Sequence, residues 1–204
     1  MTAFDPETGE LVGPASAVQA ILDGEEAIED AALQAALTAA RDPSFTITTV
    51  GVEPTATVLG GRAACVLVTD RAQGRRALLA MAPEQVAMAL AAWLGLAPRP
   101  ISGDAPIRLQ PGAMAVLIGR CEAHGHGLEP DDANALQRRL DAGVRHWTVR
   151  GERSAWRRNL EVVEGAAAGI WRVRPVDGLV ELAPTTSTAV MRELVELVAT
   201  AAGE

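Results

Sequence analysis

The segment ATVLGG (residues 56–61) is echoed later in the chain by LEVVEG (160–165), and ALLAMAP (77–83) is echoed by GLVELAP (178–184). The members of each pair lie about 100 residues apart, which is too long for a solenoid unit of roughly 20–50 residues. The apolar skeleton recurs in both pairs, whereas the charged residues do not. We therefore expect a duplicated block of secondary structure and a pseudo-twofold molecule.

The first copy has the pattern of two helices, four strands and a third helix. Apolar residues at helical spacing, bounded by Pro or Gly, predict helices over 14–22, 25–41 and 83–96. Alternating β-branched segments predict strands over 45–51, 55–59, 63–69 and 75–81. The pair Gly60-Gly61 predicts a hairpin between two of these strands, so the strands should be antiparallel.

The second copy repeats this order. Strands are predicted at 107–109, 146–151, 157–164, 169–174 and 179–183, and helices at 111–121, 129–144 and 186–201. The last helix should bury Val190, Leu194, Leu197 and Val198, which lie at helical spacing.

Two such ααββββα repeats predict an α+β fold with a central antiparallel sheet of about eight strands and helices. One compact domain would hold a frayed N-terminus (1–10), the first repeat (11–100), a Pro-rich linker (101–106) and the second repeat (107–204).

The net charge of −8 is concentrated at the start of the chain. Residues 1–44 contain nine acidic residues and one base, Arg41, whereas 45–204 contain 17 arginines and 17 acidic residues. An acidic N-terminal segment argues against a nucleic-acid partner, because neutralising phosphates needs a basic surface. The Arg-rich stretch 145–158 is either a solvated hairpin face or a site for an acidic partner.

The sequence predicts a cytoplasmic protein without a membrane span. Its N-terminus, MTAFDPETGE, is acidic and has no apolar core of a signal peptide. The apolar stretch 77–97 is interrupted by Pro83 and Glu84, which a span would not tolerate. Cys65 and Cys121 should therefore be reduced.

No catalytic or phosphate-binding motif occurs in the sequence. Cys121, His124 and His126 have ligand-like spacing, but a zinc site would need a fourth ligand such as Glu122 or Glu129. We favour a buried thiol followed by a polar loop, and expect no metal, no cofactor and no enzymatic activity. His146 should lie at the surface.

Among the tryptophans, Trp147 should be core, because Phe45 occupies the matching position of the first copy. Trp156 has no such counterpart and stands beside Arg157, so it is the candidate for an exposed aromatic anchor of a partner.

The segments ALLAMAPEQVAMALAAWLGLAPRPISG (77–103) and IRLQPGAMAVL (107–117) resemble the EspG family, and the similarity of pattern extends over residues 11–200. Members are cytoplasmic accessory chaperones of actinobacterial type VII secretion systems. The resemblance implies an antiparallel sheet with helical bundles about a quasi-twofold axis. It also implies a helical secreted client, PE/PPE-like or WXG100-like, bound before export.

In the family, clients contact a strand-connecting loop of the first half and the C-terminal helical bundle. The matching positions in this chain are Leu59, Gly60, Gly61, Arg62, Arg192, Val195 and Ala199. The alternative interpretation is that these residues form only a hairpin turn and a solvent-exposed helix face.

Two further classes of function stay open. A homodimeric interaction scaffold could pair through a sheet edge or the terminal helix. An enzyme or ligand-binding protein could use the loop 121–132 and the arginines. Co-purification of a helical client favours the chaperone, a stable homodimer the scaffold, and stoichiometric metal the third class.

Overall fold

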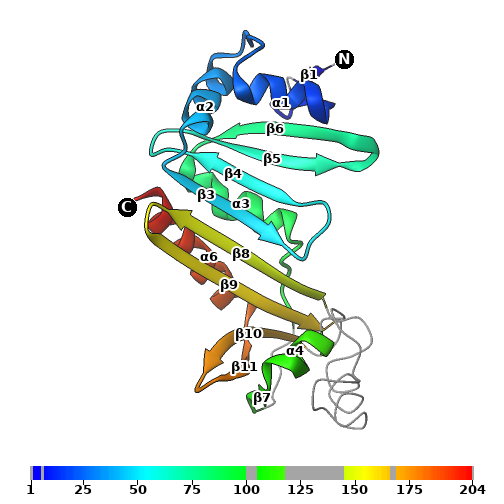
Figure 1. Ribbon diagram of the computed structural model, residues 1–204, viewed down its shortest axis with the longest axis vertical. Coiled ribbons are helices and arrows are strands. Elements are labelled where there is room, and N and C mark those ends of the chain that lie inside the picture. The colour runs from blue at the N-terminus through cyan, green and yellow to red at the C-terminus, as the bar shows by residue number, and fades with distance from the viewer. Residues whose placement is uncertain (1, 6, 100–104, 118–144, 166–168, 204) are drawn as a thin grey trace. The chain divides into compact units, whose positions relative to one another are not determined.

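The computed structural model describes residues 2–5, 7–99, 105–117, 145–165 and 169–203, which form helices and an antiparallel sheet (Figure 1). The fold class is therefore α+β, as the sequence predicts. Residue contacts divide the chain into two compact units. The first comprises Met1–Gly95, Val149–Asn159 and Leu194–Glu204, and the second comprises Leu96–Thr148 and Leu160–Glu193.

The sheet contains eleven strands, so the expectation of about eight is wrong. Three short strands account for the difference: β1 (Ala3–Asp5), β2 (Glu10–Pro14) and β7 (Ile107–Leu109). The sequence indicates β7, but β1 and β2 fall where it predicts a frayed start and a helix boundary. The three residues of β1 are all exposed and β2 ends at Gly13-Pro14, so neither shows a long alternating pattern.

The remaining first-unit strands agree closely with the sequence. They are β3 (Phe45–Val50), β4 (Ala56–Gly60), β5 (Cys65–Arg71) and β6 (Arg75–Met81), and their order is β1-β2-β6-β5-β4-β3. All pairs with a known register in this run are antiparallel. A short 3-10 turn, η1 (Ala72–Gly74), connects β5 to β6.

Three helices belong to the first unit: α1 (Ala15–Asp23), α2 (Ala31–Arg41) and α3 (Pro83–Trp93). The sequence pattern predicts that the second helix starts at Glu25, and this prediction is wrong. The helix begins after Asp30, whose carboxylate accepts the Leu33 amide at 2.8 Å and so caps it. Glu25 and Glu26 are therefore exposed residues of the connecting loop.

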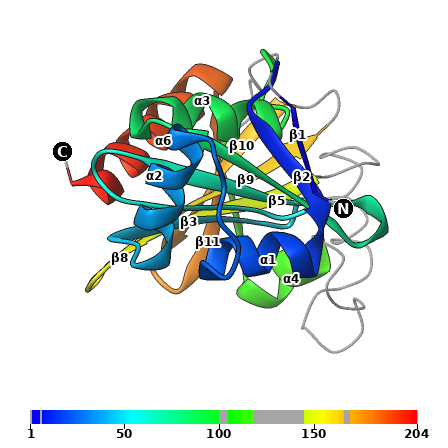
Figure 2. The same ribbon diagram turned by 90° about the horizontal axis from the view of Figure 1, so that it is seen from above.

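The first-unit strands carry helices on both faces (Figure 2). Because side chains alternate along a strand, Val66 and Leu78 lie on one face, where they join Leu11 in a core with α1 and α2. The other face includes Val58 and Leu67, and α3 packs against β4 there. Helix α1 packs against β2 and β6, and helix α2 packs against β4, β5 and β6.

The second run of strands comprises β8 (Arg145–Arg153), β9 (Trp156–Gly165), β10 (Gly169–Val176) and β11 (Leu179–Thr185), in the order β8-β9-β10-β11-β7. The tip of the β8–β9 hairpin belongs to the first unit. Asp177 and Gly178 connect β10 to β11 with φ angles of 51° and 78°, the backbone of a two-residue turn with positive φ at both positions.

Two further helices complete the described fold, α4 (Pro111–Leu117) and α6 (Ser187–Ala202). Met114 of α4 packs with Trp171, Val173 and Leu182 in the core of the second unit. All four residues that the sequence predicts as the buried stripe of α6 are at most 4% exposed. No helix in the described ranges is long and apolar enough to cross a membrane.

The two runs of strands have the same order. In the first run it is β2-β6-β5-β4-β3, and in the second it is β7-β11-β10-β9-β8. In each run the first strand along the chain pairs antiparallel with the last, as in Val12 with Ala77 and Leu109 with Val180. The two runs thus share one strand order.

Candidate functional site

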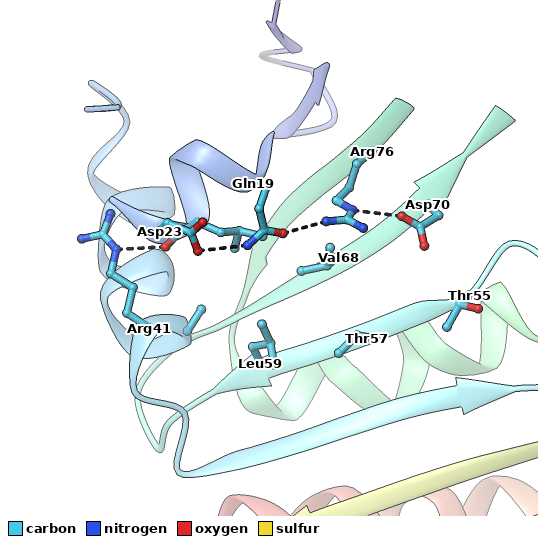
Figure 3. Close-up of a pocket in the computed structure, with 11 residues that line it drawn as sticks. Gln19, Asp23, Arg41, Thr55, Thr57, Leu59, Val68, Asp70 and Arg76 are labelled. Atoms are coloured by element: carbon cyan, nitrogen blue, oxygen red, sulfur yellow. Dashed lines mark hydrogen bonds and ion pairs between the residues drawn. The ribbon is translucent and has the colours of Figure 1, made fainter. Parts of the chain in front are cut away.

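A pocket of about 510 Å³ lies in the first unit between the C-terminal ends of α1 and α2 and the strands β4, β5 and β6 (Figure 3). Its floor comes from alternate residues of β4 and from the segment just before it, because Thr55, Thr57 and Leu59 share one face. Val68, the cross-strand partner of Thr57, extends this floor onto β5. The volume is in the range of small-ligand sites.

One part of the pocket lining is apolar. Leu22 of α1, Ala40 of α2, Leu59 of β4 and Val68 of β5 line it together. Leu22 and Ala40 are also members of the core beneath the helices, which fixes their positions. Leu59 and Val68 pack against that core but stay only partly buried. The pocket therefore offers apolar surface that can still be removed from water by a ligand.

A chain of polar side chains forms another part of the lining (Figure 3). Arg76 on β6 donates from Nε to Asp70 at 2.9 Å and from Nη1 to the Gln19 side-chain oxygen at 2.8 Å. Gln19 in turn donates its amide to Asp23 at 3.0 Å. The cross-strand pairing of Asp70 with Arg76 places the ion pair at the end of the pocket away from α2.

At the end of the pocket near α2, Arg41 stabilises the C-terminal end of α1. Its Nε donates to the carbonyl of Leu22 at 3.1 Å, and its Nη2 donates to the carbonyl of Ile21 at 3.4 Å. These are C-terminal carbonyls of α1, which a cation stabilises. The guanidinium lies against Gly24 (φ 86°), where a Cβ would approach Arg41 Cζ to 2.7 Å. Gly24 is thus needed both for its left-handed backbone and for this close packing.

Asp23 differs from Asp70, the other aspartate of the lining, which is paired with Arg76. It accepts the neutral Gln19 amide, and no ion pair joins it to a basic side chain in the described part of the chain. The exposed Glu25, Glu26 and Glu29 follow it in the loop between α1 and α2. The pocket lining itself is balanced, with two arginines and two aspartates, whereas the loop that follows Asp23 is acidic.

The structure separates the four residues that the sequence predicts at the β4–β5 connection. Leu59 lines the pocket, whereas Gly60 is buried. Its backbone packs so closely against Cys65 that there is no room for a Cβ. The Gly61 amide donates to the carbonyl of Ala64 at 3.0 Å, which closes the turn, and Arg62 is exposed. Leu59 and Arg62 are therefore available to a ligand, and Gly60 and Gly61 shape the backbone.

The three residues predicted on the last helix lie on the face of α6 that is not in the core. Arg192 is exposed, Val195 is 46% exposed and Ala199 is partly buried. Thr186, the residue before the helix, caps it, because its hydroxyl accepts the Ala189 amide at 3.0 Å. The three residues therefore lie on one stripe of α6 that faces solvent in part, and their contact with a client stays a prediction.

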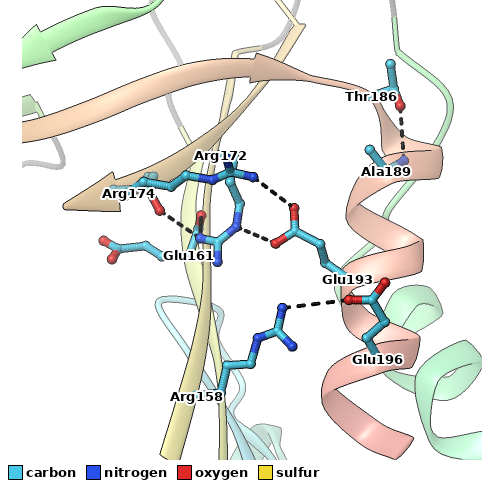
Figure 4. Close-up of polar contacts among 9 residues, drawn as sticks. Arg158, Glu161, Arg172, Arg174, Thr186, Ala189, Glu193 and Glu196 are labelled. Carbon is cyan, nitrogen blue, oxygen red and sulfur yellow. Dashed lines mark hydrogen bonds and ion pairs between the residues drawn. The ribbon is translucent and has the colours of Figure 1, made fainter. Parts of the chain in front are cut away.

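Ion pairs on neighbouring positions tie α6 to strands (Figure 4). In the second unit, the buried Arg172 donates to Glu193 at 2.8 Å and to the carbonyls of Glu161 and Val173. In the first unit, Arg158 lies 3.8 Å from Glu196. Glu193 and Glu196 lie on the side of α6 next to its buried face. The stripe with Arg192, Val195 and Ala199 takes no part in these ion pairs and faces solvent.

Trp156 is partly buried, not a fully exposed anchor. Its ring lies against Gly151 on the paired hairpin strand, where a Cβ would approach it to 3.1 Å. Arg157 is exposed and has one ion pair in the described residues, with Glu152 at 3.7 Å. A pair of this length at the surface contributes little stability, so Arg157 can reorient toward a partner.

Buried polar contacts in the second unit were not anticipated by the sequence. Glu164 accepts Trp147 Nε1 and Arg145 Nη2, both at 2.8 Å. Trp147 itself is fully buried, which confirms its predicted core position. The expectation of a surface His146 is wrong, because its side chain is 8% exposed and lies 2.8 Å from Glu161. Nothing in the sequence pattern marks Glu161 and Glu164 as partners of residues 15, 17 and 19 positions away.

The cysteines provide no candidate active site in the described residues. Burial, together with the nearby Glu84 carboxylate, raises the pKa of the Cys65 thiol to about 12, so it is protonated and unreactive near neutral pH. The cluster of Cys121, His124 and His126 lies outside the described residues. Within those residues no group of three potential metal ligands occurs.

Most of the pocket is absent from the sequence prediction, which includes only Leu59. The signal that could have found it is the period-two series Thr55, Thr57 and Leu59, which places polar and apolar residues on the same half-buried face. The contributions of α1 and α2 depend on how these helices pack on the sheet, which no short stretch of sequence shows.

A comparison of the chain with protein-family models and with curated proteins finds no match.

Proposed function

We propose that the protein is a non-enzymatic cytoplasmic chaperone that binds a helical substrate of an actinobacterial type VII secretion system before export. The observation that carries this proposal is the accessibility of both segments implied for client contact. Each offers one apolar side chain with an arginine nearby in sequence, Leu59 with Arg62 and Val195 with Arg192. Such pairs suit the apolar tip of an amphipathic helix.

The architecture is compatible with this role. An antiparallel sheet with helices is the fold implied by the family resemblance, and the equal strand order of the two runs supports an origin by duplication. Binding of this kind needs accessible surface and shape complementarity and no catalytic group.

Co-expression tests the proposal. The tagged chain is produced together with the small helical proteins encoded beside its own gene and is then purified by its tag. The molar mass of the retained complex is measured by light scattering after size-exclusion chromatography. We expect one helical partner at a fixed stoichiometry. Val195→Glu should reduce its recovery at least about fivefold, because a charge replaces an apolar contact at the interface.

Met88→Glu is the matched control. Met88 lies on α3 and is 65% exposed, so this change alters a surface methionine outside the proposed contact. Recovery equal to that of the unchanged protein is expected. The proposal is contradicted if no neighbouring helical protein is retained, or if both variants lose it to the same extent.

A homodimeric scaffold is the second candidate. It is favoured by Phe4, which is 42% exposed on β1, the edge strand at one end of the sheet. A mass of two chains without a client, reduced to one chain by Phe4→Ser, would support this candidate instead.

A further inference from the structure

We propose that the α1–sheet pocket, defined by Leu22, Asp23, Ala40, Thr57, Leu59 and Val68, receives an aliphatic side chain of a helical partner while Asp23 pairs with a basic side chain of the same helix. This inference rests on the proposed function and adds a second contact surface, distinct from α6. It also assigns the chemistry of the partner, which is aliphatic and basic.

The shape of the site supports an aliphatic occupant. Its apolar lining comes from two helices and two strands, so side chains approach the ligand from several directions. Leu59 and Val68 are half-buried and would lose their remaining contact with water when an aliphatic group enters. Leu22 and Ala40 belong to the core and are already fixed, so little side-chain freedom is lost on binding.

The charges favour a basic partner over an acidic one. Arg76 already donates to Asp70 and Gln19, and Arg41 already donates to two carbonyls of α1. Asp23 accepts a neutral amide, and no basic side chain pairs with it in the described part of the chain. Glu25 and Glu26, both exposed, follow Asp23 and Gly24 in the loop after α1 and add negative charge to this segment. A cation brought to Asp23 therefore meets negative charge without displacing an existing ion pair.

Asp23 and the apolar residues line the same pocket, so one face of a helix could meet both. Residues four apart on a helix are neighbours, so a leucine and an arginine at i and i+4 can enter the pocket and reach Asp23 together. A helical client with such a pair would thus be held by the pocket as well as by α6.

Fluorescence anisotropy with two designed peptides tests the inference. Both are Ala-rich helices of about 15 residues, a length at which an isolated helix begins to persist. One carries Leu and Arg at i and i+4, and the other carries Leu and Glu. We expect the Arg peptide to bind at least about tenfold more tightly, and its binding to weaken as salt is raised.

Variants then locate the site. Thr57→Arg places a long cation in the pocket and should weaken binding of the Arg peptide more than about tenfold, whereas Ser16→Arg, on an exposed position of the same α1, should leave it unchanged. A combined Asp23→Asn, Glu25→Gln and Glu26→Gln variant removes charge without adding bulk. It should remove most of the preference for Arg over Glu. Amide shifts of Thr57 and Leu59 on peptide addition report binding at the pocket directly.

The inference is overturned if the Glu peptide binds as well as or better than the Arg peptide, if neither binds, or if Thr57→Arg has no effect on binding. Its failure is separate from failure of the chaperone proposal. A client that depends on Val195 and ignores Thr57→Arg would leave the chaperone standing without the pocket. Peptide binding at the pocket with no client retained would leave the pocket standing without the chaperone.

Discussion

Asp70 and Arg76 in the first unit, and Glu164 and Arg145 in the second, are both ion pairs between neighbouring strands, but they differ in their access to solvent. Asp70 and Arg76 are 51% and 26% exposed at the end of a pocket. Glu164 is 3% exposed and accepts the indole of a buried tryptophan as well as Arg145. The buried Glu164 pair thus holds strands of the second unit together, while the Asp70–Arg76 pair of the first unit remains accessible to a ligand.

The largest expected effect is the loss of Glu164. Glu164→Ala leaves Trp147 Nε1 without its acceptor and Arg145 without its 2.8 Å partner. We expect the free energy of unfolding to fall by about 3 kcal/mol, the lower end of the cost of breaking a buried pair, because Arg145 is partly exposed. Urea unfolding measures it.

Glu181→Ala is the control for that change. Its partner Arg108 is largely exposed, so the loss should stay below about 1 kcal/mol. Equal losses from Glu164→Ala and Glu181→Ala would show that burial does not distinguish the two pairs.

A second contrast lies within β4, where Thr57 faces the pocket and Gly60 faces the opposite, tightly packed side. Gly60→Ala would bring a Cβ to 2.8 Å from the backbone Cα of Cys65. Overpacking of this kind should cost about 2 kcal/mol in the same unfolding measurement. Gly61→Ala is matched, since its Cβ would meet only ordinary contacts at 3.8 Å and beyond, and it should be close to neutral.

If Gly60→Ala were as well tolerated as Gly61→Ala, the strands would be free to separate at this point. The distinction between the open and the packed face of β4 would then be lost.

A smaller effect on stability is expected at the pocket itself. Asp70→Asn weakens an exposed pair with Arg76, so the free energy of unfolding should change by less than about 1 kcal/mol. A loss as large as that of Glu164→Ala would mean that the pocket charges are structural, contrary to the comparison of the two units.

Local patterns predict the elements of this fold well, because their signals are contained in short windows. The β6 strand and the buried stripe of α6 follow from alternation and helical spacing alone. The strands β1 and β2 were missed because three exposed residues and a segment ending in Gly13-Pro14 have no such signal.

The candidate site was predicted only in part, because it is assembled from segments far apart in the chain. Leu59 and Val195 lie on accessible faces that the sequence indicates. The approach of Asp23 and Arg41 to β4, and the pairing of His146 with Glu161, depend on packing between elements. No local period encodes such contacts.

The most direct test of the central claim measures stability and binding on the same variant, Asp23→Asn with Glu25→Gln and Glu26→Gln. These side chains are exposed, so we expect the free energy of unfolding to stay within about 0.5 kcal/mol of the unchanged protein. The same variant should lose most of its preference for the Leu/Arg helix over the Leu/Glu helix. An unchanged preference, or a loss of stability comparable to that of Glu164→Ala, would contradict the assignment of the first-unit charges to ligand binding.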